Sequence, residues 1–160
     1  MGDSRRFFEF SDLIADQFPN RDVAIADVAG GRGGLQAQLR CHQFTNVVSW
    51  DTRRSYAKNR PGYRYGLFDW RTAPNDYGLV VGMHPDGGTD HIIVHAAKRR
   101  IPFCVCPCCV VPSGAAYGGV KDYGPWVDHL IALAQQEAMS VSLHTLPIAG
   151  RNTVLIGRPL

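Results

Sequence analysis

The chain has 160 residues and a formal net charge of +3, from 17 lysines and arginines against 14 aspartates and glutamates. This length suits one domain with a proper core and excludes a second domain devoted to substrate recognition. The small net charge does not by itself indicate binding to nucleic acid, so any such indication has to come from local clusters of basic residues. Nothing in the sequence points to DNA.

Two features of the composition bear on location. No apolar run approaches the roughly 18 residues of a membrane span, and the N-terminus lacks a signal-peptide core. The five cysteines are an odd number, and four of them crowd into residues 104–109, which is poor disulfide geometry. We therefore expect a cytoplasmic protein in a reducing compartment, with no membrane contact.

The periodicity of apolar residues predicts alternating helices and strands along one domain, residues 1–160. The first 20 residues are expected to form a helical cap on the sheet, with the helix at 5–18. Strands are expected at 23–28, 47–50, 63–68, 79–83, within 102–111, at 141–146 and at 153–158, and helices at 34–42, 53–59, 89–100 and 125–138. The last two strands predict a terminal antiparallel hairpin, and the glycine-rich segment 112–124 predicts a loop over the site.

A glycine-rich turn follows the first predicted strand. Asp27 near the end of that strand is followed by Ala29, Gly30, Gly31 and Gly33, and Asp51 ends the second strand. This arrangement is typical of a nucleoside-cofactor site, although a glycine turn of no functional meaning remains an alternative. Gln36 stands where a dinucleotide fingerprint needs its third glycine, and a diphosphate would lie beside the Asp27 carboxylate.

S-adenosylmethionine carries no phosphate, and its ammonium and sulfonium groups favour a neighbouring acid. The segment resembles the glycine-rich first motif of class I S-adenosylmethionine-dependent methyltransferases, with Ala29 where the family most often has its first glycine. The order of the elements, with an antiparallel hairpin at the end, also resembles that family. The resemblance implies an α/β Rossmann-like domain, a mostly parallel seven-stranded sheet of order 3-2-1-4-5-7-6, and S-adenosylmethionine as cofactor.

Further cofactor contacts are expected at the ends of the second and third strands. A carboxylate at Asp51 suits two adjacent ribose hydroxyls, and either Trp50 or Thr52 is expected to border the adenine. The resemblance implies that Asp69 accepts a hydrogen bond from the adenine amino group, with Trp70 supplying stacking. Asp51 as a helix N-cap and Asp69 as a surface-turn acid remain alternatives.

A second motif follows the fourth predicted strand. The run His-Pro-Asp-Gly-Gly-Thr-Asp at residues 84–90, with Pro-Cys-Cys at 107–109, resembles a branch that carries a His-x-Cys-Gly and Thr-Asp loop and a Pro-Cys-Cys motif. That branch includes tRNA ribose methyltransferases and glutathione-S-transferase-C-terminal-domain-containing proteins; here Asp86 replaces the cysteine. We expect His84 to contact the cofactor and act as general base, and Asp86 to orient it. A histidine bonded only to the loop backbone is the alternative.

The clustered cysteines also raise the question of a metal. Their alternation along a strand is unlike the spacing of structural zinc sites, so we expect no metal. Cys104 and Cys106 are expected as small buried side chains, and Cys108 and Cys109 on the acceptor side of the pocket floor. A zinc or thiol-redox protein remains a distinct alternative.

Residues 53–65 contain five cations and three tyrosines. Interleaved basic and aromatic residues suit phosphate contacts and base stacking, so Arg53 and Arg54 are expected to bind the acceptor. A solvated helix face with core tyrosines, or a cover over the cofactor, explains the same pattern.

These observations predict a methyltransferase that moves the sulfonium methyl group directly to an oxygen or nitrogen nucleophile, with RNA as the first expectation for the acceptor. A protein or small-molecule acceptor is the alternative. A different class is a non-catalytic S-adenosylmethionine-binding subunit of a larger methyltransferase complex. A partner subunit or a homodimer is expected to complete the acceptor site.

Overall fold

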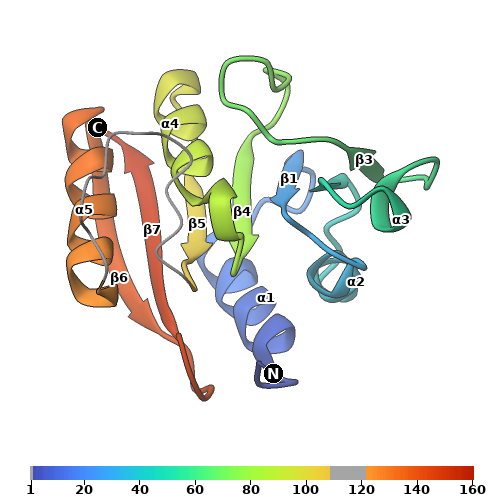
Figure 1. The fold of residues 1–160 in the computed structure, drawn as a ribbon, viewed down its shortest axis with the longest axis horizontal. Helices are drawn as coiled ribbons and strands as arrows, with labels where there is room; N and C mark the ends of the chain where they lie inside the picture. The colour runs from blue at the N-terminus through green and yellow to red at the C-terminus, as the bar shows by residue number, and fades with distance from the viewer. Residues whose placement is uncertain (1, 109–121) are drawn as a thin grey trace.

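The computed structural model describes residues 2–108 and 122–160, and its centre is one seven-stranded sheet (Figure 1). The strands are β1 (Ile25–Val28), β2 (Val47–Asp51), β3 (Tyr63–Tyr65), β4 (Leu79–Met83), β5 (Phe103–Cys106), β6 (Met139–Thr145) and β7 (Thr153–Pro159). They lie in the order β3-β2-β1-β4-β5-β7-β6. Strand β7 runs antiparallel to both β5 and β6, while the other neighbours are parallel. The predicted α/β fold, strand order and terminal hairpin are confirmed.

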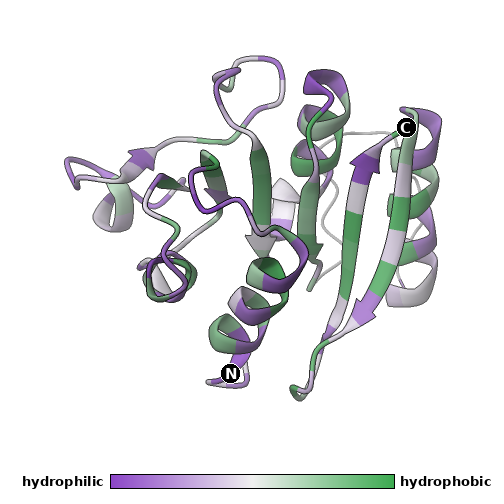
Figure 2. Ribbon diagram, turned by 180° about the vertical axis from the view of Figure 1, so that it is seen from behind, coloured by the Kyte–Doolittle hydropathy of each residue, from purple (hydrophilic) through white to green (hydrophobic). Residues whose placement is uncertain are grey.

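Helices cover both faces of the sheet. They are α1 (Arg6–Gln17), α2 (Gly34–Cys41), α3 (Arg54–Ala57), α4 (Thr89–Arg99) and α5 (Tyr123–Gln136), with the 3-10 turn η1 (Asp86–Gly88) before α4. Apolar residues of α1 and α2 pack with one face, and those of α4 and α5 with the other. Figure 2 shows the apolar residues gathered along the central strands and the inward sides of the helices. The predicted N-terminal cap is thus a helix packed on one sheet face.

Most element bounds differ from the predictions by one or two residues, and three of the differences concern the site or have a clear physical cause. The third strand ends at Tyr65 because Gly66 has φ +146°, a conformation that breaks the extended ladder, so residues 66–68 leave the sheet. The helix expected at 53–59 is one short turn. Helix α5 begins at Tyr123, two residues before Pro125, because proline is tolerated in a first helical turn.

Two other predictions concern segments outside this description. Most of the predicted loop at 112–124, and Cys109, lie outside the described residues. Within residues 2–108 and 122–160, none of the helices combines the length and apolar character needed to cross a membrane.

Candidate functional site

Two adjoining pockets open where β1, β2 and β4 end. The carboxyl ends of parallel strands meet at one edge of a sheet, which is where ligands bind in this kind of architecture. The first pocket has a volume of about 450 Å³ and the second about 490 Å³. Ala29, Arg53 and Asp86 line both, so they form the boundary between them.

The glycine turn ties the end of β1 to the end of β2. The backbone N–H of Gly30 donates to the carbonyl of Trp50 at 2.9 Å, and that of Gly31 donates to the Asp51 carboxylate at 2.8 Å. Ala29 and Gly31 both have positive φ, +56° and +59°, so the chain reverses within a few residues. The predicted residues Ala29, Gly30 and Gly31 therefore line the second pocket, while Gly33 lies against the Tyr63 ring, outside both.

Gly30 has no room for a side chain. A Cβ there would collide with the Asp27 carboxylate and would lie 2.8 Å from Ser49 Cβ. We expect Gly30→Ala to lower the free energy of unfolding by about 1–3 kcal/mol, because overpacking displaces buried neighbours. Urea unfolding measures this, with Gly124→Ala as a control, since a Cβ at Gly124 meets nothing within 4 Å. Equal stability of both variants would contradict the close packing of the turn.

Asp27 is a buried carboxyl group in the wall of the second pocket. Its Oδ2 accepts a hydrogen bond from Ser49 Oγ at 2.7 Å. Burial raises its pKa to about 7, the Ser49 hydrogen bond partly offsets this, and the nearby Asp51 charge raises it further. Because the charged form lacks a cation among the described residues, a ligand ammonium group beside Asp27 would stabilise it.

The raised pKa makes stability depend on pH in a defined direction. The unfolded chain loses the Asp27 proton near pH 4 and the folded protein near pH 7, so the stabilisation is complete below pH 4 and is lost as pH rises to 7. The total is up to about 4 kcal/mol. Asp27→Asn keeps an acceptor for Ser49 and should remove this part of the pH dependence. Urea unfolding at pH 5 and pH 8 measures the free energy of unfolding of both proteins. The same change in free energy between the two pH values in both would contradict a proton on Asp27.

Asp51 ends β2 with a carboxylate whose oxygens are fully engaged. They accept hydrogen bonds from the Gly31 N–H, the Arg53 N–H, and Arg53 Nε and Nη2, all at 2.8–2.9 Å. Burial alone would raise the pKa of Asp51, but the Arg53 and Gly31 hydrogen bonds more than offset it and lower the pKa. The alternative of Asp51 as a helix cap is wrong, since α3 has Arg53 at its N-cap position and no side-chain cap.

Arg53 spans the boundary between the pockets. Its side chain is 58% exposed, although the Asp51 side chain it holds is only 3% exposed. The guanidinium also lies over the Tyr56 ring, 4.4 Å from its centroid, and Arg32 lies over the same ring at 5.3 Å. Arg54, also predicted to bind the acceptor, is exposed on α3 and lines neither pocket.

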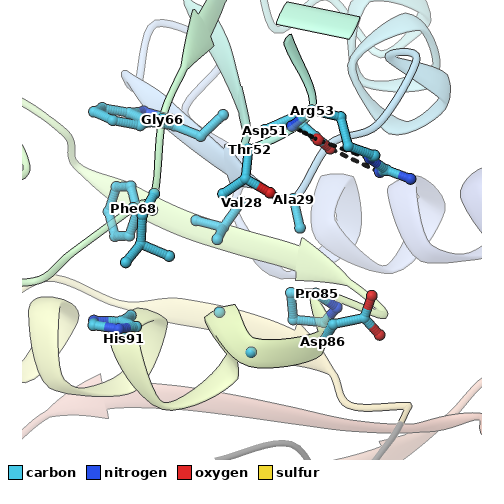
Figure 3. A pocket seen from close by; sticks show the side chains of 14 residues that line it. Val28, Ala29, Asp51, Thr52, Arg53, Gly66, Phe68, Pro85, Asp86 and His91 are labelled. Carbon is cyan, nitrogen blue, oxygen red and sulfur yellow. Dashed lines mark hydrogen bonds and ion pairs between the residues drawn. The ribbon is translucent and has the colours of Figure 1, made fainter. Parts of the chain in front are cut away.

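The first pocket has a charged end and an aromatic end (Figure 3). Asp51, Arg53 and Asp86 lie at one end, and Phe68 and His91 lie at the other. Trp50 packs edge-on against Phe68, with ring centroids 5.4 Å apart. A nucleoside fits this polarity, with its sugar at the carboxylate and its base among the rings.

Of the residues predicted to border the base, Thr52 lines the first pocket, but Asp69 and Trp70 do not. The Asp69 carboxylate accepts hydrogen bonds from Arg71, at 2.9 Å from the backbone N–H and 3.3 Å from Nη1. These bonds, with the backbone bond first, lower its pKa. The structure therefore places Asp69 in a turn outside the pocket lining. The lining contains Phe68, one of the two aromatic neighbours of Asp69 in the sequence, and His91, which the sequence did not single out.

His84 lines the second pocket and is held by its own hydrogen bond. Its Nε2 lies 2.9 Å from the carbonyl oxygen of Arg151, on the connection between β6 and β7. Burial lowers the pKa of His84, the Arg151 hydrogen bond partly offsets this, and the nearby Arg6 charge lowers it further. A neutral ring whose Nε2 donates to a carbonyl keeps the lone pair of Nδ1 available as a base. Arg6 and Phe7 from α1 also line this pocket, and the sequence did not indicate either.

The described cysteines of the cluster at 104–108 occupy two environments, while Cys41 is exposed on α2. Cys104 and Cys106 are fully buried, and burial raises the pKa of the Cys106 thiol to about 12, so both are inert. Cys108 lines the second pocket with its thiol 3.0 Å from Asp86 Oδ1. In the part of the chain that the structure describes, no group of three or more histidines, cysteines and acids is placed to hold a metal ion.

No protein-family model matches the chain, and no curated protein matches it by sequence. Solved structures do match. Magnesium protoporphyrin IX methyltransferase from Synechocystis PCC 6803, with bound S-adenosylmethionine, superposes with a TM-score of 0.65 at 11% identity, covering 99% of this chain and 82% of that one. DesVI from Streptomyces venezuelae gives 0.64 at 15% identity, with 98% and 92% covered.

An S-adenosylmethionine-dependent methyltransferase from Clostridium acetobutylicum is a third match. It gives a TM-score of 0.64 at 11% identity, covering 96% of this chain and 92% of that one. At sequence identities this low, a structural match shows a shared fold and does not show a shared activity. Together with the strand order, they show that the chain has the Rossmann-like fold of S-adenosylmethionine-dependent methyltransferases.

Proposed function

We propose that this protein is an S-adenosylmethionine-dependent methyltransferase acting on an oxygen or nitrogen nucleophile. One observation carries the proposal: two contiguous pockets meet at the glycine turn, one with a carboxylate and an aromatic end, the other with a buried acid and a histidine. The first suits an adenosine and the second a charged amino-acid chain plus an acceptor. Among the described residues, no cation acts on the Asp27 carboxyl group, so a diphosphate placed against it would be repelled.

The residues present fit the cofactor group by group. Asp51 would hold the ribose diol, Phe68 and its neighbours the base, and Asp27 the ammonium group. Arg6 and Arg32, on the wall of the second pocket, supply positive charge for the carboxylate. When bound, the cofactor supplies an electrophilic methyl group.

The protein's own part in the chemistry would fall to His84 and Asp86. His84 Nδ1 would take the proton of an acceptor hydroxyl or amine while the lone pair of the acceptor oxygen or nitrogen forms the bond to the methyl group and the methyl–sulfur bond breaks, leaving a neutral thioether. Nδ1 would be free for this because the Arg151 carbonyl fixes the tautomer. Asp86 lies at the junction of the two pockets, where it can orient the acceptor. Positioning of the two reactants would provide most of the rate enhancement.

As the acceptor we propose RNA. The support is the basic surface of α3 and β3, where Arg54, Lys58, Arg60 and Arg64 are exposed next to the pockets. Guanidinium groups already cover the tyrosines there, with Arg60 3.8 Å from the Tyr63 ring centroid. A surface of stacked guanidinium groups suits phosphates better than it suits free bases. The second pocket, about 490 Å³, would equally take a small molecule, which is the alternative acceptor.

A thermal-shift experiment tests the cofactor. S-adenosylmethionine and S-adenosylhomocysteine should each raise the unfolding temperature at millimolar concentration, and NAD should not. Stabilisation by NAD alone would overturn the proposal.

Labelled methyl transfer tests the reaction and the acceptor. The protein is incubated with methyl-labelled S-adenosylmethionine and, in separate reactions, with the RNA, protein and small-molecule fractions of a lysate. We expect labelled methyl groups to appear in the RNA fraction. Incorporation into another fraction would overturn the RNA acceptor alone. Cofactor binding without incorporation anywhere would favour a non-catalytic cofactor-binding subunit.

A further inference from the structure

His91 is a buried polar side chain in the wall of the first pocket that the proposed chemistry does not use. It lies on the first turn of α4 and is 5% exposed. Figure 3 places it at the end of the pocket that also holds Phe68, away from Asp51 and Asp86. A buried imidazole at this end needs a hydrogen-bonding account for both of its nitrogens.

One ring nitrogen is already used. The backbone N–H of Trp70 lies 3.3 Å from Nδ1 and donates to it, so Nδ1 presents its lone pair there. The neutral ring therefore carries its proton on Nε2. Asp69 Oδ1 lies 3.8 Å from Nδ1, too far for a hydrogen bond, and is taken by Arg71.

The other nitrogen, Nε2, makes no hydrogen bond to the residues that the structure describes, and it is not among their fully buried unpaired atoms, so it is open to the pocket. Water pairs such a donor until a ligand enters, so an acceptor on a ligand in the pocket can take its place. Leu67 and Phe68 also line this pocket. Nε2–H is thus a polar donor beside an aromatic ring, an arrangement that can fix the orientation of a ligand.

The position of Asp51 says which part of a nucleoside reaches His91. A ribose diol on Asp51 occupies the charged end, which leaves the base for the end with Phe68 and His91. The in-plane edges of adenine carry three ring-nitrogen acceptors, N1, N3 and N7. A donor in the wall can pair with one of them.

Resting on the proposed function, we propose that His91 reads the base: its Nε2–H donates to one ring nitrogen of adenine and so selects the adenosyl group over bases that lack an acceptor there. Trp70 contributes through its backbone by holding the tautomer. His91 is then a specificity-determining contact supplied by α4, in addition to the contacts from the strand ends.

The test uses calorimetric binding of S-adenosylhomocysteine and its 1-deaza, 3-deaza and 7-deaza analogues, each of which replaces one ring nitrogen by C–H. Wild-type protein should bind one analogue about tenfold more weakly than the parent, the loss of one hydrogen bond. His91→Phe should bind the parent and that analogue equally, at the weaker level. His91→Gln, which returns a donor near the Nε2 position, should restore most of the discrimination.

His144→Phe is the matched control, because His144 lies on the edge strand β6, outside both pockets, and should keep the wild-type discrimination. The wild-type series needs no variant, so it is decisive even if His91→Phe fails to fold. Equal binding of all four ligands to wild-type protein overturns the assignment of His91 but leaves the proposed function intact. Failure of wild-type protein to bind S-adenosylhomocysteine at all overturns both.

Discussion

Asp51→Ala should weaken the binding of S-adenosylhomocysteine by at least about 100-fold. Two hydrogen bonds from a ribose diol to a buried carboxylate are lost together, and charge-assisted bonds contribute about 1.5–3 kcal/mol each. The side chain is 3% exposed, so water cannot easily replace it as acceptor. Isothermal titration calorimetry measures the change.

The control for this variant is Asp76→Ala, an exposed acid before β4 that lines neither pocket. It should bind the ligand as wild type does. Thermal unfolding of Asp51→Ala without ligand separates a lost contact from a lost fold, since Gly31 and Arg53 also lose their partner. A folded Asp51→Ala protein with wild-type affinity would contradict the ribose role.

His84→Ala should lower the rate of methyl transfer by about 100-fold or more while the affinity for S-adenosylhomocysteine stays within a fewfold of wild type. A positioned general base contributes about 10²–10⁴-fold to a rate. His84 lines the second pocket, where the acceptor is proposed to bind. Labelled methyl incorporation into the acceptor fraction, under single-turnover conditions, measures it.

His42→Ala is the matched control for the base, because His42 follows α2 and pairs with Asp12 at 2.7 Å, outside both pockets. It should transfer methyl groups at the wild-type rate. The wild-type rate should fall at acidic pH as His84 takes up a proton, with the midpoint below the ordinary histidine range since burial lowers its pKa. An unchanged rate in His84→Ala would show that the histidine is only bonded to the hairpin.

The sequence predicted the fold because its signals are local. Strand and helix periods, the glycine turn after β1 and the closing hairpin each depend on near neighbours in the chain, so they predicted the elements. The strand order itself was implied by the family resemblance that these motifs carry, and the structure confirms it. The same logic brought Asp27, the glycine turn and Asp51 together, since adjacent parallel strands end at one edge.

The residues that the sequence missed depend on tertiary packing. His91 shares its helix with buried Ile92, Ile93 and His95, so nothing in its spacing separates a pocket wall from core. Arg6 reaches the second pocket because α1 packs beside α2, which no local pattern encodes. The early end of β3 at Gly66 changed which residues face the base, placing Phe68 in the wall and Asp69 outside it.

The pairing of Asp51 with Arg53 links the two pockets energetically. Every Asp51 hydrogen bond from the Arg53 side chain occupies an oxygen lone pair that a sugar hydroxyl would also use, so a bound diol competes with the guanidinium. In this structure the same guanidinium lies over Tyr56 at the boundary of the second pocket, so once displaced it would stay beside that pocket. An anionic acceptor would then bind more tightly to the cofactor-loaded protein than to the free one. By thermodynamic reciprocity, the same acceptor would strengthen cofactor binding by the same factor.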